Sequence, residues 1–360
     1  MSDSTIQASA PGKLILLGEY AVLEEAPCLV AAVDRSCDVQ INPLSGKTSR
    51  IVASNPDIPD IQFTLSDEGE MRFKNDLSSE NRERLRFVIS TLKYVIQQND
   101  KTFSAAAIKI DTQKFYHKTG HKLGLGASAA ITVSLLSALM KYINKPVSGR
   151  GLYREAYRIH RKAQGKLGSG TDIAASAIGG VMQYRMQKNG HEVDGILEPT
   201  AWPQDLQMIP IWAGYSASTQ DMVRKVRLYR DENSSSYEAI MEPMRKLSSD
   251  GCNAFRRGDV DGFLEVVADF VRCEQKLGEA SQTDIISKAH KEILTLVEDA
   301  GGVYKPSGAG RGDIGVAFCT DLETRLSITD AIENSNFDRL ELALQIDEIK
   351  TATLYEADSR

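Results

Sequence analysis

The chain has 360 residues, 42% of them hydrophobic, and its 43 Lys and Arg against 49 Asp and Glu give a formal net charge of -6. This apolar content suffices for two packed domains, and an acidic chain without a long basic stretch disfavours nucleic-acid binding. Five scattered cysteines without a C-x-x-C pair predict reduced thiols and a cytoplasmic protein. No basic-then-apolar signal pattern opens the chain, and no apolar run reaches the ~20 residues that span a bilayer, so we expect neither secretion nor a membrane span.

Residues 10–22 predict a turn, a strand and a second turn, because a Pro-Gly pair precedes a short apolar run and a Gly-Glu pair follows it. Lys13 stands at the start of the expected strand over residues 13–17, and Glu19 stands just past its end. Both charged groups can therefore face one cleft. A solvated lysine at a strand edge is the plainer interpretation.

Residues 122–130 form a glycine-rich stretch that runs directly into an expected helix with Ser128 in its first turn. Gly124 and Gly126 allow a tight turn and a close approach to a ligand, and the free N–H groups and dipole of the helix favour an anion. The apolar run that follows predicts a buried helix over residues 127–143. Neither the Walker A spacing nor the dinucleotide pattern fits. An ordinary glycine turn before a core helix is the alternative to phosphate binding.

A second small-residue loop occupies residues 165–175, with Ser169 and Gly170 before an expected helix over residues 172–178. Asp172 falls at or near the N-terminus of this helix. A carboxylate there satisfies free N–H groups and needs no catalytic role.

Residues 305–315 contain a third glycine-rich loop, followed by the apolar residues 316–318. The pattern predicts a loop that enters a strand. A glycine-rich hairpin is the structural interpretation, and a backbone surface against which phosphate or substrate lies is the functional one.

Strands and helices alternate in the first half of the chain, and helices cluster between residues 235 and 300. The polar stretch 187–205 is the expected domain junction. His117 and His121 are expected in a solvated loop, because no carboxylate or Cys stands at a metal-ligand spacing. The expected helices cover residues 81–98, 127–143, 152–163, 172–178, 237–256, 260–277 and 283–298, and the expected strands cover 13–17, 105–110, 181–184, 208–212, 314–319 and 340–346.

Taken in order, these segments resemble the motifs of the GHMP kinase superfamily, a group of small-molecule kinases. Residues 212–223 are similar to a substrate-region motif of the same proteins. Within the superfamily, residues 18–23 and 163–172 are closest to the phosphomevalonate kinases. The resemblance implies an α+β fold of two domains with the active site in the cleft between them. Residues 1–195 would form the N-terminal domain with the ATP phosphate loop, and residues 196–360 the C-terminal domain on the substrate side with the third glycine-rich motif.

The resemblance also implies ATP and Mg²⁺ as cofactors and gives roles to individual residues. Asp172 would take the proton of the acceptor oxygen or orient it, and Lys13 would stabilise the reacting oxygen. Ser128 would approach Mg²⁺. The implied ATP-binding residues are Lys122, Gly124, Leu125, Gly126, Ala127, Ser128 and Ala129, and the implied substrate-binding residues are Glu19, Ser169, Gly170, Ser216, Ser218, Ser307, Gly308, Ala309 and Gly310.

Three positions depart from the superfamily pattern. Ala127 replaces the first Ser usual in the phosphate loop, and Arg311 interrupts the last glycine run, where it adds positive charge. Mevalonate kinases place a magnesium-binding Glu shortly before the Asp-bearing loop, and this chain has Arg161 there, preceded by His160. We therefore expect a single Ser128 contact, which is acceptable because Mg²⁺ keeps most of its waters.

The expected reaction is ATP-dependent phosphorylation of 5-phosphomevalonate to the diphosphate, in the mevalonate route to isoprenoids. Mevalonate kinase or another small-alcohol kinase is the alternative. A diphosphomevalonate decarboxylase is less well supported, because the sequences of the loops are unlike those of that branch. A non-catalytic nucleotide-binding regulator is disfavoured because Lys13 and Asp172 are both present. The expected partner is a small-molecule substrate, and the oligomeric state stays open. A phosphorylated acceptor needs basic groups nearby, for which the candidates are Lys122, Lys166, Arg224 and Lys225.

Overall fold

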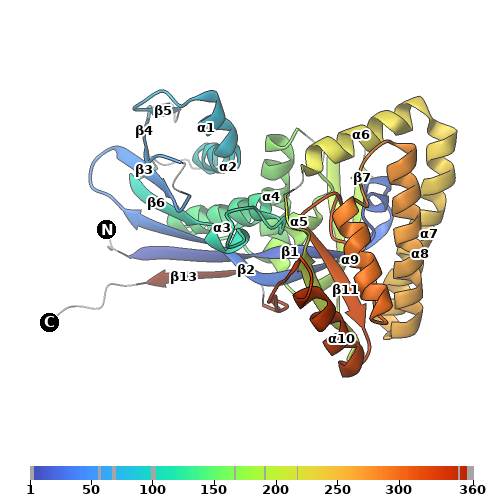
Figure 1. Cartoon of the computed structure of the whole chain (residues 1–360). Coiled ribbons are helices and arrows are strands. Elements are labelled where there is room, and N and C mark those ends of the chain that lie inside the picture. The colour runs from blue at the N-terminus through green and yellow to red at the C-terminus, as the bar shows by residue number, and fades with distance from the viewer. Residues whose placement is uncertain are drawn as a thin grey trace.

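The structure is a computed structural model that describes residues 4–55, 58–66, 70–98, 103–165, 168–189, 192–216, 218–347 and 349–354. Two sheets and ten helices make up this described part of the chain (Figure 1). The mixture of mainly antiparallel sheets with helices confirms the predicted α+β class. Among the described residues, no helix is long and apolar enough to cross a membrane.

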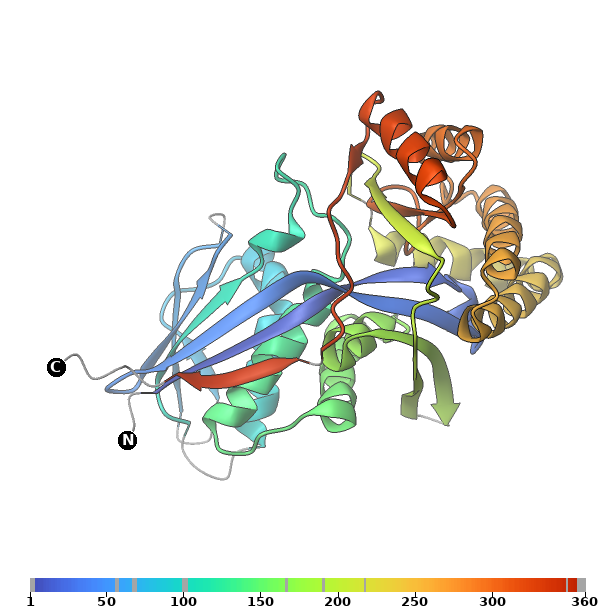
Figure 2. The ribbon, with the colours of Figure 1, turned by 90° about the horizontal axis from the view of Figure 1, so that it is seen from below.

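The larger sheet holds nine of the described strands, in the order β13, β1, β2, β6, β3, β4, β5, with β7 beside β2 and β8 beside β7. The long strands β1 and β2 extend from the part that carries β3 to β5 into the part that carries α6 to α8 (Figures 1 and 2). They therefore connect the two halves of the molecule. The strands of this sheet are β1 (Thr5–Leu17), β2 (Pro27–Pro43), β3 (Thr48–Ala53), β4 (Ile61–Leu65), β5 (Met71–Phe73), β6 (Ala106–Asp111), β7 (Val181–Asn189), β8 (Glu192–Thr200) and β13 (Lys350–Leu354).

A bulge in β1 carries the strand past the glycine-rich loop of residues 122–126. The pairing register with β2 shifts between Pro11 and Gly12. A Cβ at Gly12 would lie 2.8 Å from the Leu125 carbonyl oxygen, and the Lys13 N–H donates to that oxygen at 2.9 Å. The Pro-Gly pair thus lies within the strand, where it permits this close approach. The predicted strand start at Lys13 is wrong, because β1 already begins at Thr5.

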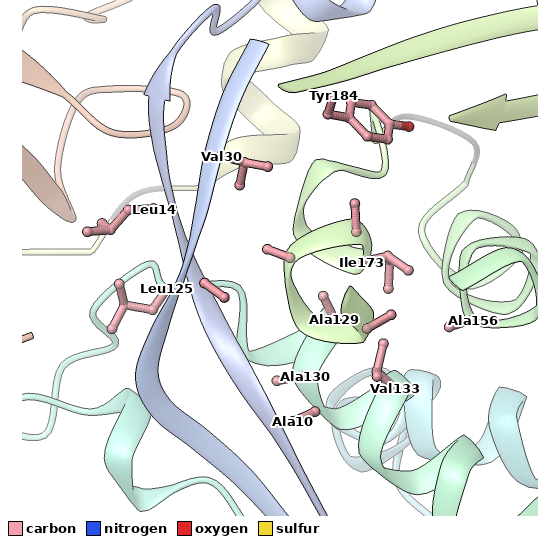
Figure 3. Packing of buried hydrophobic residues seen from close by; sticks show 14 of the residues in the cluster. Ala10, Leu14, Val30, Leu125, Ala129, Ala130, Val133, Ala156, Ile173 and Tyr184 are labelled. Atoms are coloured by element: carbon pink, nitrogen blue, oxygen red, sulfur yellow. The ribbon is translucent and has the colours of Figure 1, made fainter. Parts of the chain in front are cut away.

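Helix α3 lies at the centre of the helices that pack on the larger sheet, and its first three turns are almost entirely buried, as predicted. Figure 3 shows Ala129 and Val133 of α3 close to Ile173 of the neighbouring helix. The predicted helix over residues 81–98 is instead two helices, because Leu85 leaves helical geometry with φ -97° and ψ 5°. The elements on this side are α1 (Ser79–Arg84), α2 (Arg86–Gln97), α3 (Ala127–Tyr142), α4 (Gly149–Ala163), α5 (Thr171–Ile178) and the 3-10 turns η1 (Ala21–Glu24) and η2 (Gln113–Phe115).

The smaller sheet has the strand order β10, β11, β9, β12 and packs with α9 and α10 around its own apolar cluster, which includes Ile211 and Ile328. Helices α6, α7 and α8 lie beside the far ends of β1 and β2 (Figure 1). The remaining elements are β9 (Gln207–Trp212), α6 (Thr219–Glu232), α7 (Ser234–Arg257), α8 (Val260–Ala280), α9 (Lys288–Asp299), β10 (Val303–Pro306), β11 (Ile314–Cys319), α10 (Leu322–Glu333) and β12 (Asp338–Arg339).

The predicted strand over residues 340–346 is wrong. Its alternating leucines lie in an extended segment that crosses from the smaller sheet to the larger one and makes one isolated bridge, between Leu344 and Val33. The chain then pairs with β1 through β13 (Figure 2). The polar stretch 187–205, expected to be a junction, contains the end of β7 and the whole of β8, which pairs with β7 in the larger sheet. The division of the chain at residue 195 remains a prediction.

Candidate active site

A cleft of about 520 Å³ is lined by residues from all four of the segments singled out in the sequence. It is bounded by β1, the start of α3, the start of α5 and the loop that follows β10. The sequence therefore identified segments that meet in space, although they span some 300 residues. The predicted site residues that line the cleft are Lys13, Glu19, Lys122, Gly124, Leu125, Gly126, Ala127, Ser128, Ser169, Asp172, Ser216, Ser218, Gly308 and Ala309.

Four predicted residues are not among the described lining of the cleft, and each supports it from behind. Ala129 is fully buried in α3, and Gly170 is the N-cap of α5. Ser307 accepts a hydrogen bond from the Ile15 N–H at 2.9 Å, so its hydroxyl fixes its loop to β1. Gly310 packs on the backbone of Ile285, which leaves no room for a side chain.

The start of α3 offers unpaired backbone N–H groups to the cleft. Gly126 is the N-cap, with φ 79°, and no side chain caps the helix there. Such a helix start leaves its first N–H groups without internal partners and carries a partial positive charge. An anion such as a phosphate group is the ligand that this arrangement favours.

Lys13 and Asp172 flank this helix start. A Cβ placed at Gly126 would lie 3.2 Å from Lys13 Cγ and 3.5 Å from Asp172 Cβ. Lys13 is only 8% exposed, and burial lowers its pKa, whereas the negative charge of Asp172 acts most strongly in the opposite sense. Asp172 lies in the first turn of α5, as predicted, and its Oδ1 accepts from the Ile173 N–H at 3.0 Å. Asp172 also lines the cleft.

Ser128 reaches the cleft from the first turn of α3 and contacts a histidine of α4. Its Oγ lies 3.1 Å from Nε2 of His160, a residue that is 2% exposed. The sequence indicated only that His160 precedes Arg161. The contact depends on the packing of α3 against α4, which no local pattern reveals.

A buried ion pair holds the third glycine-rich loop. Lys305 and Glu19 form this pair, and Glu19 also accepts from the Gly308 N–H at 3.2 Å. Glu274 of α8 lies close to them, fully buried, and neither of its oxygens has a hydrogen-bond partner among the described residues. Burial raises the pKa of Glu274 well above its ordinary value. The sequence analysis gave neither Lys305 nor Glu274 a role in the site. A lysine beside a glycine-rich loop is typical of an exposed position.

Most of the predicted hydroxyl groups are engaged within the protein. Ser169 contacts the Thr171 hydroxyl at 3.0 Å, Ser216 donates to the Lys122 carbonyl at 2.7 Å, and Ser218 caps α6. They shape the loops that line the cleft.

The predicted basic residues differ in their placement. Lys122 lines the cleft, whereas Arg224 is exposed, pairs with Asp221 and, like Lys225, is not among its described lining residues. Lys166 lies outside the described residues. The sequence missed Arg86, which contributes a guanidinium group to the cleft wall.

A second, smaller cavity of about 70 Å³ adjoins the cleft and shares Tyr20, Leu23, Gly168 and Val223 with it. Three guanidinium groups line this cavity, and Glu24 is the one carboxylate among its described lining residues. Burial, and next the nearby Arg230, lower the pKa of Arg227, as expected where like charges are crowded. The arginines are Arg161, Arg227 and Arg230.

His117 is not in a solvated loop, contrary to the prediction. It is 9% exposed, stacks on Trp212 with a centroid separation of 3.9 Å, and lies 3.4 Å from an Asp338 oxygen. It therefore packs the hairpin before the phosphate loop against the smaller sheet. The described residues contain no cluster of three or more His, Cys, Asp or Glu side chains suited to a metal ion.

The fold of this chain is similar to that of solved GHMP-type kinases. Residues 86–180 match the family described as GHMP kinases N terminal domain. This stretch contains the phosphate loop, α3 and the Asp172 loop. Together with the relatives described next, the match confirms the predicted resemblance of the chain to the GHMP kinases.

Its relatives include two kinds of mevalonate-related kinase. A phosphomevalonate kinase of Streptomyces sp. (strain CL190) is 26% identical over 347 residues, which cover 90% of this chain and 92% of the relative. A mevalonate kinase of Pyrococcus furiosus is 29% identical over 243 residues, 67% of each chain. A solved structure of Streptococcus pneumoniae phosphomevalonate kinase in complex with phosphomevalonate and AMPPNP has a TM-score of 0.73, with 18% identity, and covers 94% of this chain and 99% of that chain.

Proposed function

We propose that the protein transfers the terminal phosphoryl group of ATP to 5-phosphomevalonate and so forms 5-diphosphomevalonate. The observation that carries this proposal is the meeting of Lys13, Asp172 and Ser128 at the open N-terminus of α3 in one cleft. The relative similar over nine tenths of the chain is a phosphomevalonate kinase, and the solved structure of such a kinase holds phosphomevalonate and an ATP analogue.

The nucleotide phosphates bind at the start of α3 in this proposal. The N–H groups of the first turn and the helix dipole hold the phosphate oxygens, and Lys122 and the neighbouring backbone complete the loop. The Ser128 hydroxyl is an oxygen donor that fits Mg²⁺ here, and one protein contact suffices because this ion prefers oxygen ligands and takes few from the protein. When bound, Mg²⁺ neutralises charge on the β- and γ-phosphate oxygens.

Lys13 and Asp172 act on the acceptor. An oxygen of the acceptor phosphate attacks the γ-phosphorus of ATP, the bond to the bridging oxygen breaks, and ADP leaves with the electron pair. Lys13 places a positive charge beside the transferring group, where negative charge is concentrated. Asp172 orients the acceptor and takes its proton if the attacking oxygen carries one. Glu19, held by Lys305, keeps the loop of Gly308 and Ala309 against the substrate.

The arginine-lined cavity supports an anionic acceptor. A 5-phosphomevalonate molecule carries its reacting phosphate at one end and a carboxylate at the other. Arg161, Arg227 and Arg230 place positive charge directly beside the cleft, where it favours a carboxylate, and Arg230 is held there by hydrogen bonds to Glu24 and Asp231. A neutral sugar would make no use of this charge.

The test is an ADP-release assay with MgATP and four separate acceptors: 5-phosphomevalonate, mevalonate, homoserine and galactose. We expect turnover with 5-phosphomevalonate. Turnover with mevalonate and not with 5-phosphomevalonate would mean that mevalonate is the acceptor. The proposed roles of Lys13 and Asp172 would still hold. An absence of turnover with all four would contradict the proposal.

Substitutions separate catalysis from binding. Lys13→Met and Asp172→Asn should each lower turnover by about 10²–10⁴-fold, while nucleotide binding, measured by calorimetry, survives. Wild-type turnover in either variant would refute the assigned role.

Arg227→Gln tests the recognition of the acceptor. It should raise the KM for 5-phosphomevalonate about tenfold, the scale of one charge-assisted hydrogen bond. Arg224→Gln, on the same helix but exposed, is the matched control and should leave this KM unchanged. Equal effects of the two substitutions would remove the cavity from the proposed site.

A further inference from the structure

A buried histidine lies directly behind the phosphate loop and has no role in the reaction as described so far. His160 belongs to α4, is 2% exposed, and directs Nε2 to the Ser128 hydroxyl at 3.1 Å. Its partner is the residue through which α3 offers a hydroxyl group to the cleft. The pair thus joins a core side chain to the nucleotide side of the site.

Stacking fixes the plane of the imidazole ring. Phe87 of α2 lies parallel to it, with ring centroids 4.6 Å apart and an angle of 15° between the planes. The Arg86 guanidinium carbon lies 4.7 Å from the centroid of the Phe87 ring and continues the stack toward the cleft. Because the stack restrains ring rotation, Nε2 stays directed at Ser128.

The hydrogen bond has two possible directions, which have different consequences. A neutral imidazole has one donor nitrogen and one acceptor nitrogen. A serine hydroxyl has one proton and two lone pairs. If Ser128 donates its proton to Nε2, its lone pairs are left for a cation in the cleft. If Nε2 donates, the Ser128 proton is left for an anion.

We propose that His160 is a positioning residue that accepts the Ser128 hydroxyl proton and thereby turns the Ser128 oxygen lone pairs toward the Mg²⁺ ion of the bound nucleotide. This inference rests on the MgATP binding in the proposed function. A hydroxyl oxygen ligates a cation only through a lone pair, so a fixed acceptor on its far side removes the competing orientation. His160 itself contacts neither nucleotide nor metal in this arrangement.

The direction of the hydrogen bond is measurable in the wild-type protein by ¹⁵N NMR after selective histidine labelling. The chain has five histidines, and the signal lost in His160→Phe assigns the one of interest. We expect Nε2 of His160 to be unprotonated. A proton on Nε2 would overturn the proposal, whatever the enzyme activity.

The consequence is measurable by calorimetry with MgATP and with metal-free ATP, in the absence of acceptor. His160→Phe keeps a ring in the stack but lacks the acceptor nitrogen, and Ser128→Ala lacks the hydroxyl. Each should weaken MgATP binding about 5- to 10-fold, the scale of one oriented hydrogen bond, and leave metal-free ATP unaffected. The double variant should equal Ser128→Ala alone.

Two further variants separate orientation from packing. His160→Gln retains an acceptor oxygen and should recover part of the MgATP affinity. Arg158→Gln, at an exposed position of the same helix, is the control and should bind both ligands as the wild type does. Equal losses for MgATP and metal-free ATP in His160→Phe would indicate a purely structural role and overturn the proposal.

These readouts are independent of the acceptor. A protein that uses another acceptor, and so contradicts the proposed function, would still show the Ser128 and His160 coupling in MgATP binding. A protein that binds 5-phosphomevalonate and turns it over, but shows no such coupling, would retain the function and lose this inference.

Discussion

The two glycine-rich loops that line the cleft differ in the groups that hold them. The loop of residues 122–126 is anchored by backbone hydrogen bonds and apolar side chains. The loop of residues 307–313 also has backbone hydrogen bonds, and it is anchored in addition by buried charged and phenolic groups. The first arrangement leaves N–H groups at the start of α3 available to a ligand. In the second arrangement, charged and phenolic groups bond to other parts of the protein.

The anchors of the first loop come from nearby backbone. The Leu125 carbonyl accepts from Lys13, and the Leu123 N–H donates to the Phe115 carbonyl. Leu123 and Leu125 are 2% and 1% exposed. Figure 3 shows Leu125 directed toward the same region as Leu14 of β1. No charged side chain is needed to hold this loop, so the N-terminus of α3 keeps its positive end for an anion.

The anchors of the second loop come from two distant parts of the chain, the turn after β1 and helix α8. Lys305 pairs with Glu19, 286 residues away, and Glu274 of α8 lies beside them. The Tyr20 hydroxyl donates to the Ala309 carbonyl at 2.6 Å. The position of the second loop thus depends on a buried ion pair. Removal of one partner destabilises the folded protein, because the other charge is left in a medium of low polarity.

Lys305→Met gives the largest predicted difference between the loops. It leaves Glu19 buried without its cation, and we expect a loss of about 3–5 kcal/mol in the free energy of unfolding. Lys122→Met, an exposed lysine of the first loop, should change it by no more than about 0.5 kcal/mol. Urea denaturation of both variants measures the contrast.

A loss below about 1 kcal/mol in Lys305→Met would show that Glu19 is neutral or solvated in the folded protein, since an uncompensated buried charge costs more. The distinction between the two loops would then fail.

Gly124→Ala tests the point where the two loops touch. Gly124 has φ 74°, and a Cβ there would overlap the Asp313 side chain of the second loop. We expect a loss of about 1–3 kcal/mol from strain and overpacking, together with weaker nucleotide binding. Gly120→Ala has a similar φ of 83° but meets nothing within 4 Å, so it isolates the backbone cost of about 1 kcal/mol.

Equal losses of stability and unchanged nucleotide affinity in the two variants would mean that the contact between the loops contributes to neither stability nor nucleotide binding. A larger loss in Gly124→Ala, measured by thermal unfolding and calorimetry, would locate the coupling at Asp313.

The same contrast explains what could be predicted from the sequence. The phosphate loop, α3, the Asp172 helix and β11 were predicted within a residue or two, because glycine spacing and apolar runs are local signals. The length of β1 was not predicted, because a Pro-Gly pair is typical of a turn. The bulge at Gly12 depends on the close approach of the Leu125 carbonyl. The resemblance to known kinases supplied the two-domain architecture.

Within the site, the residues that face the ligand were predicted, and those that hold them were not. Lys13, Asp172 and Ser128 lie in recognisable motifs. Lys305 looks exposed in the sequence, and His160 lies on a helix that carries several basic residues. Their partners are fixed by the packing of elements far apart in the chain, for which a single sequence contains no signal.

Glu274→Gln tests the buried charge cluster through its pH dependence. Burial raises the pKa of Glu274 in the folded protein above the ordinary value of 4.5, so above pH 4.5 the unfolded chain releases a proton that the folded protein retains. Wild-type stability should therefore fall as the pH rises from 4.5 toward the folded pKa, by at most ~1.4 kcal/mol per pH unit from this group.

Glu274→Gln cannot lose a proton and should become more stable relative to the wild type over this range. Glu265→Gln, at an exposed position of the same helix, should follow the wild type. Parallel curves for Glu274→Gln and the wild type, measured by denaturation at pH 5, 6 and 7, would mean that Lys305 keeps Glu274 ionised, and the second loop would then be held by three ionised groups.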